Sequence, residues 1–296
     1  IIEITIVNGE PMVSQPVASG FFDFGNDFTR RQEAVLEFIR AVMTKYNSKL
    51  NCKLIIGLED KYEQEHGICV FSKYNINERN TMIPDVYAME NYHGSMKKDA
   101  LELDQKRRAA VFAGTTTGRL RPESNDRLAF SNRALEFDDI DSWITSIVQI
   151  PEVHIANSYP RYKEFMRDNV SENEQKKYRY LISIDGNATA WNRVPWILNS
   201  NSILLKKNSE KVNWYYPFLI ENHHYIPFDT IDDIDLGITE DRCEYIIGNA
   251  HEFVRDYLTL DKHQLYMYQI IQEIAVINDT KSSPTFPCGR RPSPNI

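Results

Sequence analysis

The chain has 296 residues, with 34 basic and 42 acidic side chains and a formal net charge of −8. This length accommodates one large domain or two of ordinary size, and 42% hydrophobic residues are enough to build a core. The acidic balance argues against a general nucleic-acid-binding protein, which needs a basic surface, but it is compatible with a local basic pocket for a phosphorylated ligand.

The first half of the chain predicts alternating strands and helices. Residues 1–7 predict a strand, and residues 29–46 predict a helix because their apolar positions follow helical spacing. Strands are predicted over residues 53–58 and 68–72. Asp60 directly follows the first of these two strands, and its carboxylate is a candidate general base, with a plain surface acid as the alternative.

A polar segment over residues 96–108 predicts a link between two halves. The apolar run AAVFAG after it predicts a buried strand that ends in a turn rich in Gly and Thr. Backbone N–H groups and hydroxyls in such a turn can hold an anion, although a polar surface turn is the alternative. Neither a Walker loop nor GxGxxG spacing is present. The candidate ligands here are Gly114, Thr115, Thr116, Thr117, Gly118, Arg119 and Arg127.

Residues 178–206 predict a βαβ unit, with a strand, a turn at Asp185-Gly186-Asn187, a helix over 188–198 and a second strand. In open α/β sheets, ligands bind beyond the carboxyl ends of strands. Arg193 lies one turn into this predicted helix, where a core helix needs no cation and a phosphate site does. Asn187 also starts an N-x-[ST] sequon, and a glycan there would block the predicted site.

Two acidic pairs leave a metal-dependent alternative open. Asp139 with Asp141, and Asp233 with Asp235, form DxD patterns that can hold a divalent metal under a diphosphate. Both pairs lie among other carboxylates, which favours solvated faces or helix starts. The four cysteines form no CxxC pair and predict no zinc site, and no apolar run reaches the length of a membrane span.

Three sequence blocks, taken together, resemble glycosyltransferase family 90, the group of CAP10-like capsule proteins and protein O-glucosyl- and O-xylosyltransferases. They are VFAGTTTGR, KYRYLISIDGNATAWNRVPWILNSNSILLK and WYYPFLIENHHYIPFDTIDDI, in this order. The resemblance covers roughly residues 109–258, and the first half matches less closely. The chain departs from the family at Ala113, where many members have Arg, and at Glu59, where they have a basic residue.

The resemblance implies a GT-B-like α/β fold, with two Rossmann-like lobes around a cleft. It also implies metal-independent, inverting transfer from UDP-xylose or UDP-glucose to a glycan or protein hydroxyl, without a cofactor. Carried over by position, the family's base falls on Asp60, its nucleotide-binding turn on Gly114–Gly118 and its diphosphate-binding Arg on Arg193. Asp185 and Gly186 would shape the nucleotide pocket, and Arg119 or Arg127 would supply a further cation.

The predicted organisation follows from these elements. Residues 1–105 would form an acceptor-side lobe, joined by a C-terminal helix over 261–280 that crosses back, residues 106–260 the UDP-sugar lobe, and 281–296 a loose tail. Xylose is favoured over glucose. The lack of secretory features suggests a microbial or viral member in the cytoplasm (a host's, if viral), although targeting residues upstream of Ile1 are not excluded. The rivals are a DxD metal-dependent transferase and a non-catalytic nucleotide- or carbohydrate-binding protein.

Overall fold

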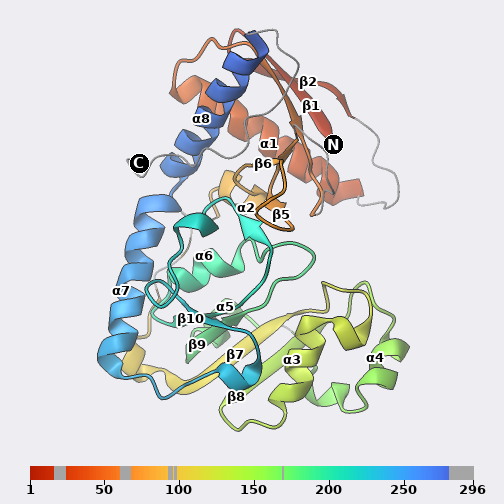
Figure 1. Cartoon of the computed structure of the whole chain (residues 1–296), viewed down its shortest axis with the longest axis vertical. Helices are drawn as coiled ribbons and strands as arrows, with labels where there is room; N and C mark the ends of the chain where they lie inside the picture. Colours follow the sequence, from red (N-terminus) through yellow and green to blue (C-terminus); the bar gives the residue numbers. More distant parts are fainter. Residues whose placement is uncertain (17–24, 61–67, 93–95, 97–98, 169, 280–296) are drawn as a thin grey trace. The chain divides into compact units, whose positions relative to one another are not determined.

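The computed structural model describes residues 1–16, 25–60, 68–92, 96, 99–168 and 170–279. These residues form two compact units, each with its own five-stranded sheet (Figure 1). Unit 1 comprises Ile1–Tyr92, Lys211–Trp214 and Thr259–Ile296, and unit 2 comprises His93–Glu210 and Tyr215–Leu258. The predicted α/β class is confirmed, while the GT-B arrangement of two lobes around a cleft stays a prediction.

The division of the chain differs from the predicted boundary in two ways. Residues 93–105 belong to unit 2 rather than to the first lobe, and the short segment Lys211–Trp214 returns to unit 1. In that segment, β11 (Val212–Asn213) pairs antiparallel with β5 (Ser72–Lys73). The predicted tail over 281–296 lies outside the described residues.

The sheet of unit 1 is mixed rather than largely parallel. The strand order is β2 (Glu10–Pro16), β1 (Ile2–Val7), β3 (Cys52–Ile56), β4 (Cys69–Val70) and β6 (Thr81–Met82). β1 is antiparallel to both β2 and β3, whereas β3, β4 and β6 run parallel. β2 was not predicted from the sequence. It follows a hairpin turn at Asn8-Gly9, with φ of 51° and 85°, the left-handed conformation that Asn and Gly tolerate.

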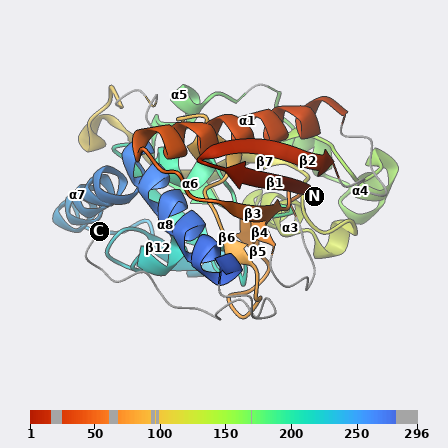
Figure 2. The same ribbon diagram turned by 90° about the horizontal axis from the view of Figure 1, so that it is seen from above.

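The core of unit 1 lies on one face of this sheet. Alternate residues of β1, namely Ile2, Ile4 and Ile6, are buried, as the two-residue period of a half-covered strand requires. Helices α1 (Gly25–Lys45) and α8 (Leu260–Asp279) pack against β2 and β3, respectively, and against each other (Figure 2). The helix α8 thus belongs to the same compact unit as residues 1–92.

A buried carboxylate links several pieces of unit 1. Asp85 caps the short helix α2 (Val86–Met89) by accepting a hydrogen bond from Ala88 N (3.2 Å), and it accepts another from Asn213 Nδ2 (3.3 Å). Asp85 is fully buried, and burial raises its pKa from the ordinary 3.8 to about 6, against the lowering effect of these hydrogen bonds. The folded state therefore holds this proton more tightly than the unfolded chain.

We expect Asp85 to make unit 1 more stable as the pH falls from about 6 toward 4 and less stable as it rises through that window. Relative to Asp85→Asn, the wild type should gain up to about 3 kcal/mol of unfolding free energy on acidification. Urea unfolding at several pH values measures how the unfolding free energy of each protein changes with pH. Burial also lowers the pKa of His263 to about 4, so this group makes the folded state less stable as the pH falls. The contribution is the same in the wild type and in Asp85→Asn, so it cancels when the two proteins are compared. Identical slopes would contradict the expectation.

The sheet of unit 2 is wholly parallel and covered on both sides. Its order is β12 (Ile226–Phe228), β10 (Ile203–Lys207), β9 (Tyr178–Ser183), β7 (Arg107–Thr115) and β8 (Ile140–Ser146). Every residue of β9 from Arg179 to Ser183 is buried. Because successive side chains point to opposite faces, helices must cover both faces of this strand.

The covering helices of unit 2 follow the strands in chain order (Figure 1). α3 (Asp126–Ala134) packs against β7 and β8, whereas α6 (Arg193–Leu198) and α7 (Glu240–Tyr257) pack against β10. α4 (Glu152–Ser158) and α5 (Glu172–Gln175) are short. In the described part of the chain, no helix combines the length and apolar character that a membrane span requires.

One predicted helix is much shorter than expected. It was predicted over residues 188–198, but α6 begins only at Arg193. Asp185 Oδ1 accepts a hydrogen bond from Ala190 N (3.1 Å) and Gly186 N donates to Ala188 O (3.1 Å), so the intervening residues form a local turn instead. Arg193 is therefore the first residue of the helix and does not lie one turn into it.

Candidate functional site

The parallel sheet of unit 2 has one topological switch point. From β7 the chain passes to β8 on one side, and it then returns to β9 on the other side of β7. Ligands of open α/β sheets bind beyond the carboxyl ends of the two strands at such a point. The segments that follow these two ends are Gly114–Gly118 and Ile184–Asn187, which we call the first and the second turn.

The first turn is anchored from behind by buried polar side chains. Thr116 Oγ1 donates to Val148 O (2.6 Å) and accepts from Val148 N (2.7 Å), which ties the turn to the segment after β8. Asn125 caps α3 through Leu128 N (3.1 Å) and donates from Nδ2 to Thr116 O (3.0 Å) and Arg119 O (2.9 Å). Sequence reasoning missed Asn125, although Asn before a helical run is a common N-cap signal.

The two predicted turns do lie together. Gly118 N donates to Asn187 Oδ1 (3.0 Å), and Gly118 has a φ of 135°, which favours glycine. Arg127 lies near the start of α3. Its guanidinium donates to Thr115 O and Thr117 Oγ1 in the first turn and to Ile184 O in the second. The two segments, about 70 residues apart in sequence, thus form one local structure.

Arg193 lies beneath these turns, against the strands. Its Nε donates to Ile182 O (2.7 Å), its Nη1 to Ala113 O (2.9 Å) and its Nη2 to Gln175 Oε1 (2.8 Å). Its guanidinium also stacks over Phe112, 5.3 Å from the ring centroid. The three nitrogens are thus already hydrogen-bonded to the protein, and the guanidinium links β7 to β9.

The two arginines bring two positive charges close together in the site, with Asp185 acting through space on Arg127 and Glu172 on Arg193. Burial lowers the pKa of Arg193 to about 9, with repulsion from Arg127 as the next cause, and burial lowers the pKa of Arg127 to about 10 while Asp185 raises it. Both stay protonated at neutral pH. Among the described residues, neither guanidinium forms an ion pair with a carboxylate. Buried charge is costly unless it is compensated, so a bound anion would be favoured here.

Two further candidates flank the arginines. The Arg119 side chain is exposed and makes no hydrogen bond or ion pair within the described part of the chain, so it is available to a ligand. Asp185 Oδ2 is buried and has no hydrogen-bond partner among the described residues. The glycines of the turns have no room for a side chain: a Cβ on Gly186 would lie 2.7 Å from Thr117 Oγ1.

Asp60 lies in unit 1, after β3. Its Oδ1 accepts a hydrogen bond from Arg31 Nη1 (3.0 Å), and its side chain is 35% exposed. Arg31 also donates to Leu58 O (2.7 Å), which fixes the guanidinium and, through it, the carboxylate. A carboxylate that is oriented and partly exposed has the properties of a general base. The assignment itself stays a prediction.

Three of the four aspartates in the two DxD patterns are hydrogen-bonded within the protein. Asp141 accepts from Tyr178 Oη (2.6 Å) and pairs with Arg107, Asp233 closes a capping box with Thr230, and Asp235 accepts from Gly237 N (2.8 Å). Within the described residues, no group of three His, Cys, Asp or Glu side chains is arranged to hold a metal ion.

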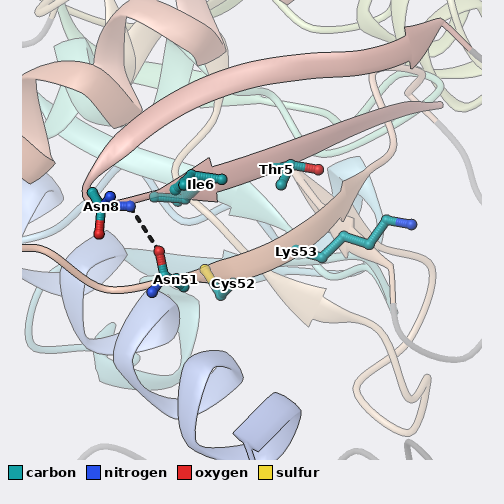
Figure 3. A pocket seen from close by; sticks show the side chains of 7 residues that line it. Thr5, Ile6, Asn8, Asn51, Cys52 and Lys53 are labelled. Atoms are coloured by element: carbon teal, nitrogen blue, oxygen red, sulfur yellow. Dashed lines mark hydrogen bonds between the residues drawn. The ribbon is translucent and has the colours of Figure 1, made fainter.

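Unit 1 carries a concave feature, shown in Figure 3. It is an open depression around the end of β1 and the start of β3, where Asn8 N donates to Asn51 Oδ1 (2.7 Å). Its only charged lining residue is Lys53, which pairs with Glu3 (2.7 Å). This depression lacks the convergent polar groups of the two turns.

Comparison with known proteins agrees with the sequence resemblance. The sequence model of glycosyl transferase family 90 matches residues 86–289, which is more than half of the chain and includes both turns, Arg127 and Arg193. The chain belongs to glycosyl transferase family 90. Asp60 lies outside the matched range.

Curated relatives within the family are similar over a shorter segment. Protein O-glucosyltransferase 2 of Danio rerio is 30% identical over 111 residues, which is 36% of this chain and 22% of that protein. Protein O-glucosyltransferase 3 of Homo sapiens is 26% identical over 111 residues, with the same coverage of 36% and 22%. The match thus spans about a fifth of the length of these relatives.

Solved structures align more loosely. A glycosyltransferase from Rickettsia africae aligns with a TM-score of 0.46 and 11% identity over 90% of this chain and 85% of that one. A pneumococcal O-GlcNAc transferase solved with UDP and GlcNAc aligns with a TM-score of 0.36 and 11% identity, over 66% of this chain and 40% of that one. Scores at this level do not by themselves establish a shared fold.

Proposed function

We propose that this protein transfers a sugar from a UDP-sugar to a hydroxyl group of a glycan or protein acceptor. The observation that carries the proposal is the pair of partly buried guanidiniums, Arg127 and Arg193, which form no ion pair among the described residues. They lie behind two interlocked turns at the switch point of a parallel sheet. The diphosphate of a nucleotide sugar supplies the negative charge that this arrangement lacks. Membership of glycosyl transferase family 90 supports the same chemistry.

The donor end of the reaction needs positive charge on the departing UDP. We propose that Arg119, which is exposed and unpaired among the described residues, contacts the diphosphate directly. Arg193 and Arg127 would contribute their charge from inside the fold, where the low dielectric strengthens it. In this proposal the cations replace a metal ion, and no cofactor takes part.

The acceptor end needs a base. We propose that Asp60 takes the proton from the acceptor hydroxyl as its oxygen attacks the anomeric carbon of the donor. The bond from that carbon to the UDP oxygen breaks, UDP leaves with the bonding electrons, and attack from the opposite face inverts the carbon. The exposed part of the Asp60 carboxylate, oriented by Arg31, supports this role.

The sugar has two candidates. The sequence prediction favours xylose, whereas the curated relatives are named O-glucosyltransferases, which favours glucose. The two donors differ by one hydroxymethyl group, and a pocket wall usually separates such pairs by about 10- to 200-fold in kcat/KM. One donor is therefore expected to dominate clearly in a direct comparison.

The cytoplasm is the proposed compartment, supported by the sequon at Asn187. The side-chain oxygen of Asn187 accepts a hydrogen bond from Gly118 N, so the amide is part of the contact between the two turns. A glycan attached to this amide would have to emerge from that contact. The protein is therefore better suited to a compartment in which the sequon is not modified.

A UDP-release assay across a panel of UDP-sugars tests the proposed function. We expect release above background with UDP-xylose or UDP-glucose, rising when an acceptor with free hydroxyls is added, and unchanged by EDTA. Activity lost with EDTA and restored by Mn²⁺ would instead favour a DxD transferase. Tight UDP binding without release from any donor would favour a non-catalytic binding protein.

A further inference from the structure

Arg127 is bound to both turns at once. Its Nε and Nη2 donate to Ile184 O at 3.2 and 2.9 Å, and its Nη1 donates to Thr115 O (3.1 Å) and Thr117 Oγ1 (2.6 Å). A guanidinium has five N–H donors in a rigid planar fork, and four are used in these bonds. One side of the fork therefore holds the second turn, and the other side holds the first.

The two turns and Phe112 lie close to this guanidinium. A Cβ on Gly186 would lie 3.1 Å from Arg127 Nη2, and a Cβ on Gly114 would lie 3.6 Å from Arg127 Nη1. The ring centroid of Phe112 lies 5.8 Å from the guanidinium carbon. The width of the guanidinium thus determines how closely the two backbones approach each other.

The direct contact between the turns depends on that approach. The hydrogen bond from Gly118 N to Asn187 Oδ1 forms only while the two segments keep their present separation. Lysine would keep a positive charge here, but its ammonium is a point donor that cannot reach acceptors on both sides in the same plane. The planar shape of Arg127, in addition to its charge, is a property that this arrangement uses.

We propose that Arg127 is a positioning residue that sets the spacing between the first and the second turn, and through it the affinity of the donor site. The effect on affinity rests on the function proposed above, whereas the effect on spacing does not. In this role Arg127 does not contact the nucleotide. It holds the backbone groups that do.

Glycine resonances provide the first test, because the chain has only 12 glycines and three of them lie in the turns. In spectra of the full chain labelled with ¹⁵N-glycine, Arg127→Lys should shift Gly114, Gly118 and Gly186 without any nucleotide present. Arg133→Lys is the matched control, since Arg133 lies on the same helix and is exposed, with Asp232 as a surface partner (2.8 Å). Unshifted turn glycines in Arg127→Lys would overturn the proposal.

Nucleotide affinity provides the second test. If Arg127 positions the turns, Arg127→Lys should weaken UDP binding by about 10- to 100-fold although it keeps the charge, the range expected for lost hydrogen bonds to a charged group. Arg127→Gln, which also removes the charge, should weaken binding at least as much. Retained affinity in Arg127→Lys with a loss only in Arg127→Gln would show that the charge itself binds the diphosphate, and the proposal would be wrong.

A second variant perturbs the spacing between the two turns without removing any polar group. Gly186→Ala adds one methyl group against Thr117 Oγ1 and Arg127, so it should shift Gly114 and Gly118 and weaken UDP binding even if the Arg127 variants fail to fold. Wild-type spectra and affinity in Gly186→Ala would contradict the proposal. If UDP leaves the wild-type spectrum unchanged, the proposed function fails, while the nucleotide-free spectra still decide the role of Arg127.

Discussion

Asp60→Asn is expected to lower the turnover number by about 10²- to 10⁴-fold, the usual contribution of a general base, while UDP affinity stays close to that of the wild type. The reason is that asparagine has nearly the same shape but cannot accept the proton of the acceptor hydroxyl. Steady-state UDP release with a saturating donor gives the turnover number, and calorimetric titration gives the UDP affinity.

Glu59→Gln is the matched control for this experiment. Glu59 is the adjacent residue, it is exposed, and its substitution removes the same charge without touching the contact between Asp60 and Arg31. Thermal unfolding of both variants shows whether the loss of that contact disturbs unit 1. Full transfer activity in folded Asp60→Asn would remove Asp60 from the mechanism.

Arg193→Met should destabilise the protein by about 2–4 kcal/mol, because it leaves buried acceptors without their donor. The acceptors are Ile182 O, Ala113 O and Gln175 Oε1, and the first two belong to β9 and to β7. Methionine fills similar space, so the loss is not one of packing volume. Urea unfolding at neutral pH measures the change.

The same variant separates two roles of Arg193. The sequence prediction assigns it to the diphosphate, whereas its three hydrogen bonds within the protein indicate a further role in joining the strands. UDP affinity measured well below the unfolding midpoint distinguishes them. Unchanged stability with lost UDP binding would contradict the structural role, and unchanged UDP affinity would contradict the donor-site role. Arg161→Met, at an exposed surface ion pair, is the control.

The location of the two turns could be predicted from the sequence because it depends on local patterns. An apolar run followed by Gly, Thr or Asp-Gly predicts a strand end, and the carboxyl ends of parallel strands lie along one edge of a sheet. The targets of the arginine side chains could not be predicted in this way. Arg193 and Arg127 donate to carbonyls that are between 11 and 80 residues away, and only the folded backbone decides those partners.

Two other differences have local causes. The Asn8-Gly9 pair is a strong hairpin signal, so β2 could have been predicted from turn chemistry, although no strand was predicted over residues 10–16. By contrast, β11 has only two residues, which is too short for any periodicity. Its pairing with β5 is decided by tertiary contacts, including the stacking of Trp214 on Tyr266 at 4.6 Å.

The return of Lys211–Trp214 to unit 1 bears on the order in which the chain can fold during synthesis. Unit 1 needs this segment and α8 in addition to residues 1–92, so its core and the β5–β11 pair stay incomplete until α8 has left the ribosome, although its five-stranded sheet is already synthesised. Unit 2, in contrast, has all of its strands and helices once Leu258 has emerged. The N-terminal part of the protein is thus synthesised first and completed last, and a fragment that ends near Tyr92 would lack both partners of its core.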